Sequence, residues 1–176
     1  MTQFQMILGS KHFLRHYFTD YDTPLVLLKS LEKGRNYALL DLAAAIPFVA
    51  PMAYTQVAGA QPIPTSGFFN LMYFGVSDAD EPVFVAKVRR LIDHHAQLRG
   101  CTSITLFKAN TKEIEYLLLT SWEKKLDVFA SRHMPLVTPV MAYMDRAAAA
   151  GGYHEAIYTA VAPDSADDED DDEEKD

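Results

Sequence analysis

An unbroken succession of strand, helix, strand and strand signals in residues 67–122 constrains the fold more than any other part of this sequence. Apolar and aromatic residues fill both alternating sets of positions in 68–76, which is typical of a strand buried on both faces. Apolar residues then recur every three or four positions in 84–98, as in an amphipathic helix, and Gly100 follows where a left-handed C-cap belongs.

Two further apolar runs, 101–108 and 114–122, are separated by a short polar link, which predicts an antiparallel hairpin. The strand before the helix cannot simply pair in sequence with this hairpin. We therefore expect a split β-α-β-β arrangement of the α+β class, with the helix on one face of an antiparallel sheet.

The helical stretch 123–132 is expected to turn Leu126, Phe129 and Ala130 inward. Prolines interrupt this stretch, and a second helix is predicted over 139–150, followed by a last strand over 153–161.

The first part of the chain predicts a small α+β half. Strands are expected over 3–8, 24–31, 37–42 and 52–57, together with a helix over 10–18 that Ser10 caps. The proline-containing segment 59–67 marks a boundary. This gives a half over 1–66, a domain over 67–163 and a tail over 164–176. Sixty-odd residues bury little surface, so the first half should lean on the second. Both halves run strand, helix, strand, strand, without a convincing sequence repeat.

The net charge of -8 is located in the tail, because residues 164–176 hold ten acidic side chains and one lysine. Residues 1–163 then carry 15 basic and 14 acidic side chains, and a nearly neutral body has no electrostatic footprint for nucleic acid. The tail should be disordered, and a solubilising role is favoured over a lure for a basic partner or a divalent cation.

The single cysteine, Cys101, excludes an internal disulfide, and its place after a helix C-cap, where the helix dipole raises the pKa of a thiol, predicts an inert buried thiol. His12 and His16 have metal-chelating spacing but no carboxylate at a recognised offset, so no metal site is predicted. No signal peptide or membrane span is expected, since prolines break the apolar run 37–54. These features indicate a cytoplasmic protein that binds neither nucleic acid nor a membrane.

Three short strings give residues 67–161 a family resemblance. They are Val76-Ser77-Asp78 before Pro82, Leu98-Arg99-Gly100-Cys101, and Leu117-Leu118-Leu119-Thr120-Ser121-Trp122-Glu123. The domain resembles the antibiotic-biosynthesis-monooxygenase family, whose ferredoxin-like domains pair into a dimeric α+β barrel. The resemblance implies a homodimer in which one sheet face meets the helices and the other meets the partner sheet. The two-part layout is similar to the two-domain haem-degrading monooxygenases of Gram-positive bacteria, which implies haem as a cofactor or substrate.

Active members of that branch use an asparagine on the first strand, and a tryptophan and a histidine from the later helical stretch. Met72 falls where the asparagine belongs, while Asn70 lies two residues earlier on the same strand face. Trp122 matches a strand-ending tryptophan that packs, and no second tryptophan follows. His133 is the sole histidine of the helical stretch, but it comes earlier than the family's.

Two functions remain open. The first is a haem-dependent or cofactor-independent monooxygenase for a small, flat, apolar molecule, with His133 as ligand or base and Asn70 as an orienting donor. Trp122, Met72 and Tyr73 would then contact the substrate. The second is a non-catalytic dimeric module for small-molecule binding or stress regulation, whose cavity is filled by side chains such as Met72 and Tyr73.

Overall fold

The computed structural model describes residues 2–166, and its first half contains four strands and two short helices. These are β1 (Gln3–Gly9), α1 (Lys11–Leu14), α2 (His16–Asp20), β2 (Leu25–Ser30), β3 (Tyr37–Asp41) and β4 (Met52–Ala60). The predicted cap is confirmed, because the hydroxyl of Ser10 accepts a hydrogen bond from the backbone N–H of Phe13. Most of the predicted tail lies outside the described residues.

The second half follows the predicted order of strand, helix, strand and strand. It consists of β5 (Phe68–Gly75), α3 (Glu81–Asp93), the 3-10 turn η1 (His95–Gln97), β6 (Cys101–Ala109), β7 (Glu115–Trp122), α4 (Lys125–Ser131), α5 (Thr138–Ala149) and β8 (Tyr153–Val161). The long helix ends earlier than predicted, at Asp93, and η1 completes the turn. Gly100 has the expected positive φ of 77°.

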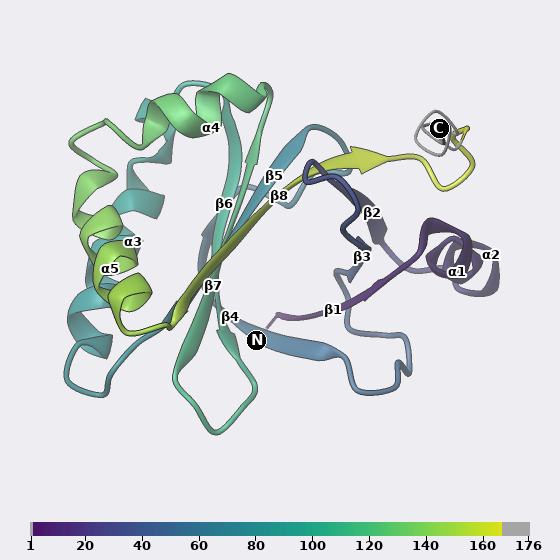
Figure 1. Ribbon diagram of the computed structural model, residues 1–176, viewed down its shortest axis with the longest axis horizontal. Coiled ribbons are helices and arrows are strands. Elements are labelled where there is room, and N and C mark those ends of the chain that lie inside the picture. Colours follow the sequence, from purple (N-terminus) through teal and green to yellow (C-terminus); the bar gives the residue numbers. More distant parts are fainter. Residues whose placement is uncertain (1, 167–176) are drawn as a thin grey trace, which may run out of the picture.

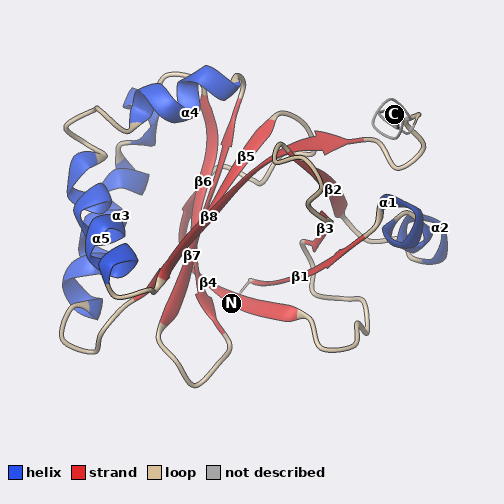
Figure 2. Ribbon diagram, viewed as in Figure 1, coloured by secondary structure: helices blue, strands red, loops and turns tan. Residues whose placement is uncertain are grey.

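The eight strands form one closed antiparallel barrel in the order β1-β3-β2-β8-β5-β7-β6-β4. Helices α3, α4 and α5 cover the wall built by the second half, and α1 and α2 lie beyond the first half (Figure 1). The strands separate these two groups of helices in Figure 2. Two junctions close the barrel, since β2 pairs with β8 and β4 pairs with β6.

Each half has the same internal strand order. The order is β4-β1-β3-β2 in the first half and β8-β5-β7-β6 in the second, so both read fourth, first, third, second. At each junction the second strand of one half pairs with the fourth strand of the other. The chain is therefore a fused pair of ferredoxin-like units, although its sequence shows no repeat.

This architecture corrects the expected source of the barrel's second wall. The sequence predicts that a second copy covers the other face of the sheet, whereas the chain's own first half covers it. The error arose because strand patterns do not show which free edges pair. A homodimer stays a prediction. The predicted division at residue 66 also stays a prediction, but ladders cross it at both junctions.

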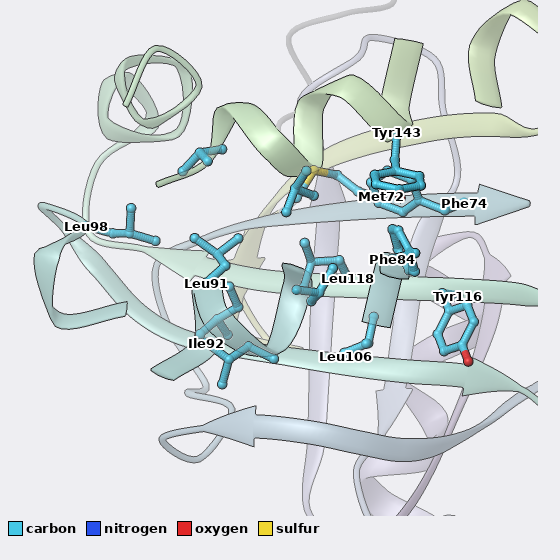
Figure 3. Close-up of a cluster of buried hydrophobic side chains, with 14 of the residues drawn as sticks. Met72, Phe74, Phe84, Leu91, Ile92, Leu98, Leu106, Tyr116, Leu118 and Tyr143 are labelled. Atoms are coloured by element: carbon cyan, nitrogen blue, oxygen red, sulfur yellow. The ribbon is translucent and has the colours of Figure 1, made fainter. Parts of the chain in front are cut away.

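Strand β5 is buried on both faces, as its sequence predicts. Phe69 and Leu71 face the barrel interior, where they pack with Phe107 and other apolar side chains. Met72 and Phe74 face the helices, and Figure 3 shows them close to Tyr143 of α5. β5 thus divides the second half into an interior layer and a helix-covered layer.

The orientation predicted for α4 is wrong. Leu126 is 78% exposed and Phe129 is 42% exposed, while Val128 and Ser131 are buried. A helix of seven residues makes about two turns, so an apolar residue can be found on either side and the periodicity does not select one.

No helix within residues 2–166 is both long enough and apolar enough to cross a membrane.

The fused barrel predicts how the second half behaves alone. A fragment of residues 67–163 exposes its interior layer and the free edges of β6 and β8. In a dimer of this fragment, β6 of each copy can pair with β8 of the other copy. We expect the fragment to form a dimer, measured by light scattering during size exclusion. A folded, monomeric fragment would show that the two halves are not interchangeable in this way.

Candidate functional site

A small cavity lies between the helices and the sheet, where the family resemblance places the active site. It has a volume of about 20 Å³, and Asn70, Met72 and Trp122 are among its lining residues. A water molecule needs roughly 10–15 Å³, so the cavity has room for about one. Three of the five predicted site residues therefore come together, around very little space.

Asn70 is the unusual polar residue of this cavity. Its side chain is 2% exposed, and its Oδ1 atom has no hydrogen-bond partner among the described residues. The nearby hydroxyl of Thr120 is already used, since it donates to the backbone carbonyl of Asn70 at 3.4 Å and accepts from the indole N–H of Trp122 at 2.8 Å. A buried acceptor without a partner is energetically costly, which indicates a place for a water molecule or a small ligand group.

Arg132 also lines the cavity, but its charge is neutralised. Its guanidinium lies 2.6 Å from the Glu155 carboxylate, which also accepts a hydrogen bond from the hydroxyl of Tyr153 at 2.9 Å. Such a charge-assisted network holds the side chain in place and reduces its availability to a ligand.

The other two predicted residues lie elsewhere. His133 is exposed in the turn after α4 and does not line the cavity. Tyr73 is on the opposite face of β5. Their predicted roles stay predictions, but the structure does not bring either residue to Asn70.

The helix-covered side does not fit a haem. The apolar layer around Met72 and Leu118 fills the space, the residual cavity holds about one water, and no histidine is among its described lining residues.

A much larger pocket of about 630 Å³ opens at one mouth of the barrel. The C-terminal ends of β1, β5 and β6 and the N-terminal ends of β4, β7 and β8 surround it. Its chemically distinctive lining residues are Tyr54, Tyr73, Glu113, Glu115, His154 and Tyr158. Of these, Tyr73 alone was predicted as a site residue.

Three tyrosines of this mouth have raised pKa values. Burial raises the pKa of Tyr54, Tyr73 and Tyr158, so their hydroxyls stay protonated at neutral pH. For Tyr73 the other two tyrosines and Glu115 raise the pKa further. Within residues 2–166, none of the three hydroxyls has a hydrogen-bond partner. The ring of Tyr73 stacks on His154, with centroids 5.2 Å apart.

The mouth was missed because its residues come from distant strands. Tyr54 is on β4, Glu115 on β7 and Tyr158 on β8, and the order of these strands around the barrel sets their proximity. The sequence holds only a weak signal for this pocket. An acidic residue, Glu115, begins a mostly apolar strand, and tyrosines recur at inward positions of the strands.

The remaining candidate groups have structural roles. The Nδ1 atoms of His94 and His95 lie 2.8 and 3.0 Å from carbonyl oxygens at the end of α3, where a histidine interacts favourably with the helix dipole. Burial raises the pKa of the Cys101 thiol to about 11, in agreement with an inert thiol. Across residues 2–166, no group of three or more His, Cys, Asp or Glu side chains could hold a metal ion.

Known structures share this architecture. No protein-family profile and no curated protein matches the sequence. A ferredoxin-fold protein related to antibiotic biosynthesis monooxygenases, from Listeria monocytogenes, superposes with a TM-score of 0.80 at 20% identity, over 92% of this chain and 95% of that one. The chain has the fold of monooxygenase-related proteins.

Two further structures with this fold have different descriptions. A haem-degrading enzyme from Listeria monocytogenes gives a TM-score of 0.76 at 20% identity, over 89% of this chain and 98% of that one. A major regulator of staphylococcal pathogenesis gives 0.74 at 10% identity, over 91% and 99%. An enzyme and a regulator thus share one fold, and identities this low establish the fold alone.

The unsatisfied acceptor of Asn70 predicts an unusual mutational effect. Replacing a buried polar group that has no partner by an apolar group of similar size removes its desolvation cost. Asn70→Leu should therefore leave the free energy of unfolding unchanged or raise it by up to about 1 kcal/mol, measured by urea denaturation. Asn70→Ala, which leaves a cavity, is the control and should destabilise the protein. A clear loss of stability in Asn70→Leu would show that Oδ1 has a strong partner.

Proposed function

We propose that this protein binds a small molecule in the mouth of its barrel, as a non-catalytic module on a monooxygenase-related fold. One observation carries the proposal: the mouth offers about 630 Å³, whereas the helix-covered side offers about 20 Å³.

The composition of the mouth supports this function. Ligand pockets typically have about 300–1,000 Å³ and combine apolar or aromatic walls with a few polar groups. Here the walls include the rings of Tyr54, Tyr73 and Tyr158, and the polar groups include Glu115 and the tyrosine hydroxyls. The hydroxyl of Tyr54 has no partner although its residue is only 2% exposed, so it is available to a ligand.

The proposal can be tested with benzyl alcohol as a neutral aromatic probe. In a titration followed by ¹H–¹⁵N NMR, the amides of Gly75, Asn110 and Gly152 should shift, with a Kd on the order of 1 mM. Tyr73→Leu should weaken binding severalfold. Tyr21→Leu, which changes a tyrosine at the end of α2 that stacks on Tyr17, should leave the affinity unchanged. Shifts confined to residues away from the mouth, or no shifts, would contradict the proposal.

A second candidate function is a monooxygenase, haem-dependent or cofactor-independent, that acts on the helix-covered side. The unpartnered Oδ1 atom of Asn70 favours it, because a buried, unsatisfied acceptor is typical of a site that a ligand completes. Under this hypothesis the helices α4 and α5 would have to move away from the sheet to admit a flat substrate.

Haemin distinguishes the two functions. We expect the Soret band of added haemin to stay unshifted, and reductant with oxygen to bleach it no faster than without protein, because the helix-covered side has no room for the macrocycle. His133→Ala should behave like the wild type and like His12→Ala, an exposed-histidine control. A Soret shift that is lost in His133→Ala alone would favour the monooxygenase instead.

A further inference from the structure

We propose that the ligand of the barrel mouth is a small organic cation, an ammonium group carried on an apolar body. The inference rests on the proposed binding function and adds the chemical class of the ligand.

The formal charges that line the mouth are all negative. Glu113 and Glu115 carry them, and no lysine or arginine lines the pocket within residues 2–166. The cation that acts on the nearby Tyr158 is Arg35, which lies outside the lining and is paired with Glu32 at 3.0 Å. An anionic ligand would meet uncompensated repulsion here, whereas a cation would be attracted.

Glu115 lines the same pocket as Tyr54 and Tyr73. In agreement with this placement, its carboxylate raises the pKa of both tyrosines, although burial is the larger cause. The protonated phenols cannot supply a second negative charge at neutral pH, so the carboxylates are the anionic partners of a bound cation.

The aromatic walls add a second source of attraction. A cation within about 6 Å of a tyrosine ring is stabilised by the negative face of the π-system, more strongly when both are desolvated. Tyr54 and Tyr158 are buried residues of the pocket lining, and Tyr73 is half-buried there. Rings and a carboxylate thus line the same pocket.

The tyrosine hydroxyls offer hydrogen-bond acceptors to an ammonium group. Those of Tyr54, Tyr73 and Tyr158 have no hydrogen-bond partner within residues 2–166, so their oxygens are available to accept from a ligand. An ammonium nitrogen is a pure donor with up to three N–H groups, which matches a carboxylate and two hydroxyl oxygens. An apolar body would then fill the remaining volume beside Met52 and Leu8.

The test compares three probes of matched shape: benzylammonium, benzyl alcohol and benzoate. Benzylammonium should bind about tenfold more tightly than benzyl alcohol at pH 7, and benzoate least tightly, by NMR titration of the mouth amides. Glu115→Gln should cost benzylammonium about tenfold in affinity and change benzyl alcohol by less than about twofold. Glu123→Gln is the matched control, since Glu123 is exposed just beyond the other end of the same strand.

Each outcome decides the matter. Equal affinities for benzylammonium and benzyl alcohol would overturn the inference and leave the proposed binding function intact, as would tightest binding of benzoate. Absence of binding by all three probes would overturn both. If Glu115→Gln does not fold, the wild type still decides: added salt should weaken benzylammonium binding but not benzyl alcohol binding, and equal salt responses would overturn the inference.

Discussion

The structure depends on two strand junctions that join the halves of the chain. Backbone hydrogen bonds of β2 with β8 and of β4 with β6 convert two open four-stranded sheets into one barrel with no free edge. Without them each sheet would expose an apolar face that includes Phe4 and Leu40 in the first half and Leu71 in the second. The junctions also gather the ends of six strands at one mouth, which creates the large pocket there.

The two faces of β5 explain why the family's site and the pocket of this protein differ. Leu71 and Tyr73 belong to the interior, and Tyr73 reaches the mouth, whereas Asn70 and Met72 belong to the helix-covered side. β5 therefore borders both cavities. Substitutions on one face of this strand can close one cavity while the other cavity stays open. In this chain Met72 helps to close the helix-covered side, where Asn70 keeps one unpartnered acceptor, and the hydroxyls of Tyr54, Tyr73 and Tyr158 lie at the mouth.

The local structure of the second half could be predicted from the sequence, because each signal there is local. Apolar residues at both alternating sets of positions predicted β5. Apolar residues every three or four positions from Phe84 onward predicted α3, and Gly100 predicted the turn with positive φ. The pairing of the halves could not be predicted, since strand edges carry no sequence label. The site was found in part: Asn70, Met72 and Trp122 do share a cavity, but its size depends on side-chain packing that no motif encodes.

Because the two units are fused in one chain, the pocket at the barrel mouth can be asymmetric, which a symmetric homodimer does not allow. In both halves the first strand ends at the pocket mouth and the fourth strand begins there, as Leu8, Gly75, Met52 and His154 show. A symmetric pair of second halves would bring two copies of every mouth residue, hence two of each carboxylate, around one axis. The fused chain presents Glu113 and Glu115 once each, both from the second half, while the first half contributes Leu8, Met52 and Tyr54, so the formal charges of the mouth come from one half alone. An asymmetric pocket of this kind can orient a ligand whose charge lies at one end, which a mouth with two equivalent sets of carboxylates could not do.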